Sequence, residues 1–446
     1  MENICALATP YGVSAIAIIR ASGDDSIKLI SSIFSGKDLT KVKSHTINYG
    51  YILDKNNNPI DEVLCNVYFA PKSFDGENMV EINCHGGTFV IEKIIKRLLE
   101  IGFRLAERGE FSKRAFLNHK ADLTGVEAIM DVISATNDIS LNASISSLRK
   151  STLNLVHKFR NDILDILAKI EVNIDYPEYE DMVDVTHKYL EPVLLNLKEK
   201  MKEILDNSKI SNVAIHGIKT AIVGRPNVGK SSLLNMMLEK DKAIVSNIPG
   251  TTRDLVEDNL TIGNVTLNLV DTAGIHETKD LVESIGIKRS KEALDSCDLV
   301  LLVLDSSEDL KEEDKYLIKI TENKNRIVIL NKSDLKSKIK FDNAISISAL
   351  KNEGMDLLAK KILEITSINN ITKMDGNYLN NVRQIDLMDK AYNSIIEAYD
   401  ACLILVDISL IEIDIKKAFD LLGEITGESY EDELLDALFT KFCLGK

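Results

Sequence analysis

The stretch Gly224-Arg-Pro-Asn-Val-Gly-Lys-Ser231 decides the fold of the central part of the chain. It follows the apolar run Thr220–Val223 and opens the helical pattern Ser231–Leu238. In this context the spacing GxxxxGKS predicts a loop whose backbone N–H groups surround phosphate oxygens at a helix N-terminus. We expect Lys230 to reach the β- and γ-phosphates and the Ser231 hydroxyl to ligate Mg²⁺. A chance Gly-Lys-Ser turn is the alternative, and the motifs that follow argue against it.

Around this loop, strand-length apolar runs alternate with helical patterns from residue 217 to about residue 368. Such alternation predicts βαβ units around a mostly parallel sheet. The expected strands are Thr220–Val223, Val265–Val270, Leu299–Leu304, Arg326–Leu330 and Ala344–Ile347.

Three further motifs follow in order, each directly after a predicted strand. Asp271-Thr-Ala-Gly274 offers a carboxylate to the magnesium shell and a glycine N–H to the γ-phosphate. In Asn331-Lys-Ser-Asp334, the Asp334 carboxylate matches the N1–H and amino donors of guanine, and adenine would leave it unpaired. We expect Asn331 to brace the loop, the Lys332 stem to lie along the base, and the backbone of Ser348-Ala-Leu350 to bind guanine O6. Together these motifs predict a GTPase.

The segment between the first two motifs predicts a switch. Within Pro249-Gly-Thr-Thr252, Thr252 is expected to complete the Mg²⁺ shell when GTP is bound, and a plain polar turn is the alternative. Where many GTPases place a water-orienting glutamine, this chain has Ile275, which cannot orient water. Glu283 is a candidate for that role, and a solvated helix-face glutamate explains it about as well.

No arginine finger is evident, although transition-state charge requires a cation. The Asn227 side-chain oxygen could hold a monovalent ion against the phosphates. We therefore expect K⁺ there, with the carbonyls of Ser246 and Ile248 as further ligands.

The composition of the chain limits the number of domains and the classes of function that it can have. A chain of 446 residues suggests about three domains. Its 54 basic and 69 acidic residues give a net charge of −15, which argues against an indiscriminate polyanion binder. The six cysteines form no CxxC pair, so neither a zinc ribbon nor a disulfide framework is indicated. With no secretory signal and no window resembling a membrane span, the sequence predicts a cytoplasmic protein.

The segments before and after the GTPase motifs differ from them in the pattern of their apolar residues. Residues 1–118 look α+β: Ala15–Ile19 and the alternating Val63–Phe69 predict strands, and Ile91–Ile101 predicts a helix. Residues 119–214 are helical, and the apolar seam from Leu141 to Ile170 suits one long amphipathic helix. The predicted segments are 1–118, 119–214 (helical domain, first part), 215–370 (GTPase domain) and 371–446 (helical domain, second part).

Some motifs along the chain are shared with a known family. They are Ala8-Thr-Pro10, Val80-Glu-Ile-Asn-Cys-His-Gly-Gly87, Glu110-Phe-Ser-Lys-Arg-Ala-Phe-Leu-Asn118, Gly224–Ser232, Asp271–Gly274 and the terminal Phe442-Cys-Leu-Gly-Lys446. The N-terminal motifs and the Cys-Leu-Gly-Lys ending are far more selective than the GTPase motifs. On these residues the whole chain resembles the MnmE (TrmE) family of tRNA-modification GTPases. The one small departure is Leu444, where isoleucine or valine is commoner in the family.

The resemblance implies an N-terminal domain that binds a formylated tetrahydrofolate and forms a homodimer. It implies a P-loop, Ras-like GTPase domain inserted between two parts of a helical bundle. The GTPase domains would meet across the dimer when K⁺ and GTP are bound. With the flavoprotein MnmG (GidA), the family uses a folate one-carbon unit to build an aminomethyl or carboxymethylaminomethyl group at carbon five of the wobble uridine of tRNA.

Site residues carry over by position. The implied folate contacts are Arg20, Glu81, Lys120 and Lys446. The implied metal ligands are Ser231 and Thr252 for Mg²⁺, and Asn227, Ser246, Ile248 and Thr251 for K⁺. The implied catalytic residues are Glu283 and Cys443. The implied GTP-binding residues are Asn227, Val228, Gly229, Lys230, Ser231, Ser232, Ser246, Asn247, Ile248, Pro249, Gly250, Thr251, Thr252, Asp271, Thr272, Ala273, Gly274, Asn331, Lys332, Ser333, Asp334, Ser348, Ala349 and Leu350.

Other interpretations stay open at this point. Cys443 could be a prenylation cysteine, although Lys446 is a poor terminal residue for one, a buried core thiol, or a group that assists the one-carbon chemistry. Cys84-His85 could indicate a metal or a nucleophile, although a turn beside the folate site explains it better. A ribosome-assembly GTPase, or a nucleotide switch without turnover, would share the four GTPase motifs.

The basic stretch from Arg149 to Arg160 is explained by a solvated helix face better than by tRNA binding. We therefore expect most of the tRNA affinity to reside in the partner or in a composite surface.

Overall fold

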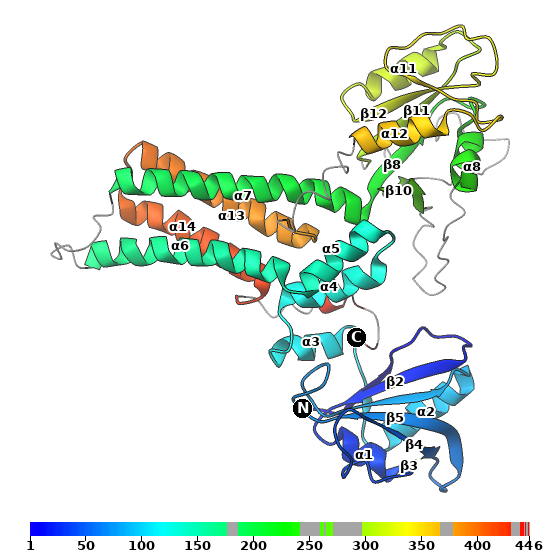
Figure 1. The fold of residues 1–446 in the computed structure, drawn as a ribbon, viewed down its shortest axis with the longest axis vertical. Helices are drawn as coiled ribbons and strands as arrows, with labels where there is room; N and C mark the ends of the chain where they lie inside the picture. Colours follow the sequence, from blue (N-terminus) through cyan, green and yellow to red (C-terminus); the bar gives the residue numbers. More distant parts are fainter. Residues whose placement is uncertain are drawn as a thin grey trace. The chain divides into compact units, whose positions relative to one another are not determined.

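The structure is a computed structural model, and it describes residues 1–175, 186–240, 259–262, 265–270, 297–365, 378–429, 438–440, 442 and 445. The chain forms two compact units (Figure 1). Unit 1 combines residues 1–130 with residues 423–446, and unit 2 comprises residues 131–422. The units therefore do not follow chain order, because the C-terminal residues group with the N-terminal sheet. The four predicted segment boundaries remain predictions.

Unit 1 is built on a seven-stranded sheet in the order β3-β4-β5-β6-β2-β1-β7. Neighbouring strands are antiparallel except β1 and β7, which are parallel. The strands are β1 (Ile4–Leu7), β2 (Ile16–Ser22), β3 (Phe34–Ser35), β4 (Thr46–Leu53), β5 (Pro59–Tyr68), β6 (Met79–His85) and β7 (Arg104–Leu105).

One face of this sheet is covered by α1 (Ser26–Ser32) and α2 (Thr88–Glu100). The alternation predicted for β5 is confirmed, because Val63, Cys65 and Val67 are buried against these helices. Side chains of the opposite parity leave the sheet on the other face. The predicted α+β character of this part of the chain is thereby confirmed.

The C-terminal tail packs onto the helices that follow the sheet in unit 1. These are α3 (Glu110–Leu117) and α4 (Leu123–Ser134). Phe439 and Phe442 form an apolar cluster with Phe116, Leu123 and Val126. At Gly109, a Cβ atom would lie 2.4 Å from the carbonyl oxygen of Phe439. A residue larger than glycine at this position would therefore prevent the tail from packing this closely.

The helices of unit 2 correct one prediction. The seam from Leu141 to Ile170 is two helices, α5 (Asp138–Leu148) and α6 (Ser151–Asp175), and not one. The break falls at Lys150, whose backbone is left-handed with φ of 69°. Apolar spacing continues through the break, which is why periodicity alone could not reveal it.

The second helical stretch, which begins near residue 379, packs against the helices of the first stretch (Figure 1). Helix α13 (Val382–Leu403) lies along α7 (His187–His216), and Arg160 of α6 stacks on Phe419 of α14 (Ile408–Thr426). The N–H of Leu379 donates to Ser208 Oγ (2.8 Å), and the side-chain amide of Asn380 donates to Ser147 Oγ (2.7 Å). These bonds pin the chain to α7 and α5 just before α13 begins.

The central segment forms a six-stranded sheet in the order β13-β12-β11-β8-β10-β9. Its strands are β8 (Ile218–Val223), β9 (Asn259–Ile262), β10 (Val265–Val270), β11 (Leu299–Asp305), β12 (Arg326–Asn331) and β13 (Ile345–Ser346). All pairings are parallel except that of β9 with β10. The mostly parallel sheet is confirmed, whereas β9, a short edge strand, was not predicted.

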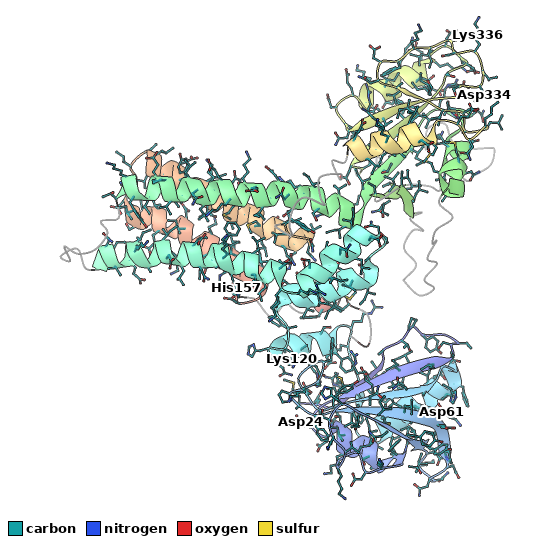
Figure 2. All side chains as sticks on the ribbon, in the orientation of Figure 1. Asp24, Asp61, Lys120, His157, Asp334 and Lys336 are labelled. Carbon is teal, nitrogen blue, oxygen red and sulfur yellow. The ribbon has the colours of Figure 1, made fainter. Side chains whose placement is uncertain are left out.

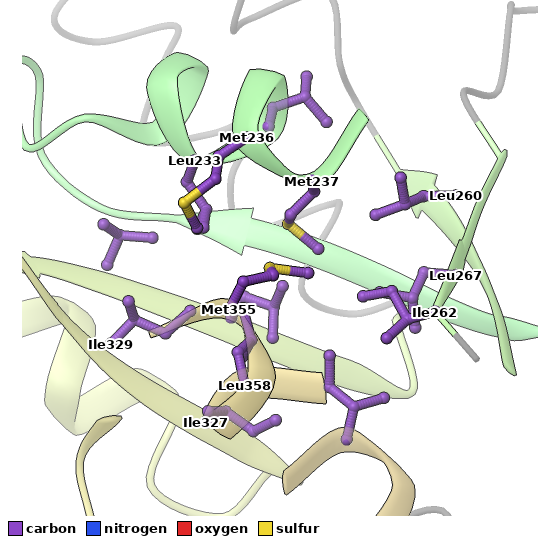
Figure 3. Packing of buried hydrophobic residues seen from close by; sticks show 14 of the residues in the cluster. Leu233, Met236, Met237, Leu260, Ile262, Leu267, Ile327, Ile329, Met355 and Leu358 are labelled. Carbon is purple, nitrogen blue, oxygen red and sulfur yellow. The ribbon is translucent and has the colours of Figure 1, made fainter. Parts of the chain in front are cut away.

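Helices cover both faces of this sheet, as the burial of its strands requires. On one face, α8 (Lys230–Lys240) and α12 (Met355–Ile365) contribute Met236, Met237, Met355 and Leu358 to a core with the strands (Figure 3). On the other face, α11 (Glu312–Ile320) packs against a second core. Within the described residues, no helix is both long enough and apolar enough to cross a membrane.

The left-handed backbone at Lys150 yields a stability prediction. Lys150→Gly should raise the free energy of unfolding by about 0.5–1 kcal/mol, because glycine adopts positive φ without steric cost. The matched change Lys158→Gly, within α6, should lower it by about 1 kcal/mol. Urea unfolding followed by helical circular dichroism measures both. Equal losses at the two positions would mean that α5 and α6 form one continuous helix in solution.

Candidate functional sites

The phosphate-loop motif joins β8 to α8. The Lys230 ammonium donates to the carbonyl oxygens of Gly224 (2.7 Å) and Arg225 (3.1 Å), which folds the side chain back across the loop. Burial lowers the pKa of Lys230. A phosphate would give this buried cation an ionic partner in place of two neutral carbonyls, so the loop has the chemistry of an anion site.

Asn227 lies at the tip of the loop with an exposed side chain and a left-handed backbone, φ 65°. Val228 beside it is fully buried. The loop thus turns its Asn227 amide outward while Val228 anchors it to the core.

Arg225 is a second charged residue of the phosphate loop, and the sequence alone did not indicate its role. Its guanidinium bonds to Glu308 (2.5 Å) and Asp314 (3.2 Å), and its side chain is 9% exposed. Burial lowers the pKa of Arg225, but the hydrogen bond to Glu308 and the negative charges of Asp314, Glu308 and Asp305 together outweigh burial, so the net pKa is raised. In this arrangement Arg225 ties the loop to the start of α11.

Asn331, at the end of β12, links three loops. Its side-chain amide donates to the Val228 carbonyl (2.8 Å), and its side-chain oxygen accepts the N–H of Ala349 (3.1 Å). The bracing role expected of Asn331 is therefore present in the structure. At Gly229, where φ is 97°, a Cβ atom would lie 2.2 Å from Asn331 Nδ2. Any larger residue at 229 would displace the amide that joins the loops.

The Ser348–Leu350 motif holds the Asp334 side chain in place. The Ser348 hydroxyl donates to Asp334 Oδ1 (2.6 Å). This bond lowers the pKa of Asp334, so the carboxylate that should read guanine is ionised at neutral pH. Figure 2 shows Asp334 at the edge of the sheet, in the loop after β12.

The structure thus brings the phosphate loop, the Asn331–Asp334 motif and the Ser348–Leu350 motif to one edge of the sheet. Other predicted site residues lie outside the described residues. These are Ser246, Asn247, Ile248, Pro249, Gly250, Thr251, Thr252, Asp271, Thr272, Ala273, Gly274, Glu283, Cys443 and Lys446.

Unit 1 holds a second group of charged residues. Arg20 and Glu81 are opposite each other on β2 and β6, and Arg20 Nη2 lies 2.9 Å from Glu81 Oε1. Arg20 also donates to the carbonyl oxygen of Gly445 (3.3 Å), and the Tyr68 hydroxyl donates to Glu81 Oε2 (3.5 Å). The C-terminal tail therefore meets the predicted folate residues.

The loop between β5 and β6 completes this group. The Arg20 guanidinium lies 4.6 Å from the centre of the Phe74 ring. At Gly76, a Cβ atom would lie 3.0 Å from Cγ of Lys120, so the Lys120 side chain packs against this loop. Asp75 is fully buried, and its Oδ2 has no hydrogen-bond partner among the described residues. Tyr68 and Phe74 were missed in the sequence because only the fold brings Tyr68 to Glu81 and Phe74 to Arg20.

The Cys84-His85 pair lacks the features of a nucleophile or a metal site. Cys84 is buried, and burial raises the pKa of its thiol to about 11. His85 Nδ1 pairs with Asp61 (2.8 Å). Among the described residues, no group of three or more His, Cys, Asp or Glu side chains could hold a metal ion.

The basic stretch separates into different environments. Arg149 and Lys150 are exposed at the turn between α5 and α6, and Lys158 is exposed along α6. Arg160 is half-buried, with its guanidinium 4.2 Å from the centre of the Phe419 ring. The stretch therefore does not form one continuous basic surface.

Two family models together match nearly the whole chain. The family model for the MnmE helical domain matches residues 123–443, and the model described as the GTP-binding protein TrmE N-terminus matches residues 3–120. The chain belongs to the MnmE family of tRNA-modification GTPases. Membership identifies it as a GTP hydrolase and confirms the resemblance drawn from the sequence motifs.

Relatives with this name match over their full lengths. The tRNA modification GTPase MnmE of Acholeplasma laidlawii is 45% identical, with 100% of this chain and 99% of the relative covered. Those of Streptococcus gordonii and Ligilactobacillus salivarius are 46% and 47% identical, each covering 100% of this chain and 99% and 98% of the relative. Among solved structures, a variant of Era from Aquifex aeolicus is 32% identical over 33% of this chain and 56% of its own, with a TM-score of 0.26.

The close approach of Gly229 to Asn331 yields a binding prediction. Gly229→Ala should weaken GDP binding about 100-fold, because roughly 3 kcal/mol of backbone strain and displaced packing corresponds to two tenfold steps. Gly87→Ala is the control, since a Cβ atom there meets nothing closer than 3.6 Å. Isothermal titration calorimetry measures both affinities. Wild-type affinity in the Gly229→Ala variant would contradict the loop geometry.

Proposed function

We propose that this chain is a K⁺-dependent GTPase that works with the flavoprotein MnmG (GidA) on the wobble uridine of tRNA. The product is a 5-carboxymethylaminomethyl or 5-aminomethyl group, and a tetrahydrofolate derivative such as 5-formyltetrahydrofolate supplies the one-carbon unit. The observation that carries the GTPase part is the Asn331 side chain, which joins the phosphate loop to the loop of Asp334. Family membership carries the role in tRNA modification.

Residues of the phosphate loop have the chemistry that two metal ions require. Ser231 follows Lys230 in the first turn of α8, and with Thr252 it would hold Mg²⁺. The exposed amide oxygen of Asn227, with Ser246, Ile248 and Thr251, would hold K⁺, which is an oxygen-binding cation. When bound, these cations supply positive charge where the phosphates gain negative charge.

The chain's own groups account for binding and orientation. Lys230 is positioned to exchange its carbonyl partners for phosphate oxygens. Arg225 is bound to Glu308 and Asp314, so a cation other than this arginine is needed at the phosphates. Glu283 is proposed to orient the attacking water, since Ile275 cannot.

The group around Arg20 fits a folate. Folate offers an anionic glutamate tail and a planar pterin with amino and ring N–H donors. Arg20, Lys120 and Lys446 would bind the tail or nearby oxygens, and Glu81 would accept from the pterin. The aromatic ring of Phe74 would add a stacking surface, and Asp75 Oδ2, which has no hydrogen-bond partner among the described residues, would add an acceptor. Cys443 is proposed to assist the one-carbon chemistry; it precedes Gly445, whose carbonyl accepts from Arg20, by two positions in the sequence.

The sheet of unit 1 supports a homodimer. On the face that α1 and α2 leave uncovered, Ile16, Ile47, Tyr49 and Leu64 are 63%, 69%, 58% and 43% exposed. Contiguous exposed apolar side chains on a sheet favour burial against another surface. A second copy of this chain is the occupant that the family implies. We place the protein in the cytoplasm and assign most of the tRNA affinity to the complex with its partner.

The K⁺ assignment predicts a cation preference. Wild-type GTP turnover should be about tenfold or more faster in KCl than in NaCl, because a fitted cation stabilises transition-state charge. Asn227→Ala should remove this preference. Asn343→Ala is a matched control, since Asn343 is also exposed with positive φ, 58°, outside the phosphate loop. Steady-state phosphate release measures all three proteins. Equal wild-type rates in the two salts would refute the K⁺ site.

The folate assignment predicts a modification defect. Glu81→Gln should weaken 5-formyltetrahydrofolate binding about tenfold, because a charge-assisted hydrogen bond contributes about 1.5–3 kcal/mol. Cells that lack this chain should lose the wobble modification, and Glu81→Gln should restore it less fully than wild type. Glu100→Gln, on the exposed side of α2, is the control.

Calorimetry measures folate binding, and nucleoside analysis of bulk tRNA measures the modification. Unchanged wobble nucleosides in cells that lack the chain would exclude the role in tRNA modification. If the Glu81→Gln variant binds 5-formyltetrahydrofolate with wild-type affinity, only the proposed contact between Glu81 and the pterin is excluded.

A further inference from the structure

The segment that follows β11 belongs to none of the nucleotide motifs, yet it holds one of them in place. Asp305 ends β11 with its side chain 2% exposed, and its Oδ2 lies 2.5 Å from Lys332 Nζ. The N–H of Ser306 donates to the Asn331 carbonyl (2.9 Å), and its hydroxyl donates to the Lys332 carbonyl (3.2 Å). This segment therefore contacts both the backbone and a side chain of the guanine motif.

The Asp305 carboxylate has a fixed orientation. Its Oδ1 accepts two bonds from Ser307, from the N–H (2.9 Å) and from the hydroxyl (2.6 Å), which leaves Oδ2 for Lys332. Strand register places Asp305 opposite Asn331. Burial raises the pKa of Asp305, but the bonds from Lys332 and Ser307 outweigh burial and lower it. A buried carboxylate in this state requires its cation.

Lys332 is held at both ends of its side chain. Its backbone is left-handed, with φ of 62°, and its ammonium is bound by Asp305. The side chain between these points is 35% exposed. A lysine stem is flexible when free, and it presents apolar surface when its ammonium is fixed.

We propose that Asp305 is a positioning residue for guanine nucleotides, which acts by holding Lys332 so that the lysine stem lies along the base. The proposal rests on the GTP site described above. Ordering the lysine before the nucleotide arrives removes a cost that binding would otherwise carry. GTP and GDP benefit equally, because they share the base and ribose.

A double-mutant cycle on the full-length chain separates this role from simple stabilisation of the fold. Asp305→Asn should weaken GDP binding about tenfold, and Lys332→Met should weaken it at least as much. The double variant should bind GDP within about twofold of Lys332→Met alone, because Asp305 has no further effect once its lysine is gone. Isothermal titration calorimetry gives the affinities.

Asp342→Asn, the same change at an exposed residue of the same domain, should bind GDP like wild type. The melting temperature without nucleotide checks that each variant folds. If Asp305→Asn does not fold, Ser307→Ala takes its place, with a loss of about threefold that Lys332→Met again removes.

An equal loss in the presence and absence of Lys332, or no loss, would overturn the proposal. Failure of the wild-type chain to bind GDP would instead contradict the GTP site itself.

Discussion

The hydrogen bond from the Asn331 side chain to the Val228 carbonyl is the interaction on which the nucleotide site depends. Asn331 is 2% exposed, so a group left without its partner there would carry the full desolvation penalty. The same side chain accepts from Ala349, and it occupies the space that a Cβ atom at Gly229 would need. One amide therefore fixes the separation between the phosphate loop and the guanine loop.

Both candidate sites hold their charges in internal ion pairs. In the nucleotide site, Arg225 is bound by Glu308 and Asp314, and Lys332 by Asp305. In unit 1, Arg20 is bound by Glu81. Partly buried cations need such partners, and the pairing also orders long side chains before a ligand arrives. The two sites differ in the partners of their cations: among the residues that the structure describes, Lys230 donates to neutral carbonyls, whereas Arg20 pairs with a carboxylate.

Five of the six strands of the central sheet could be predicted because each is a mostly apolar run of strand length, and helices cover both faces of the sheet. Val265–Val270 was predicted with the bounds that the structure has. The edge strand β9 was missed because it is four residues long and carries no such run. The break between α5 and α6 was missed for a different reason: the apolar spacing continues through Lys150, and only backbone conformation marks the end of α5.

The sequence alone determined the phosphate loop, the guanine motif, the mostly parallel sheet and the family, because each follows from short motifs or from local patterns of apolar residues. Only the tertiary structure decided the partners of Arg225, Lys332 and Arg20. It also brought Tyr68, Phe74 and the C-terminal tail to Arg20. The physical reason is that spacing encodes strand, helix and turn locally. The partner of a charged side chain depends on which distant segments the folded chain brings within a few ångströms.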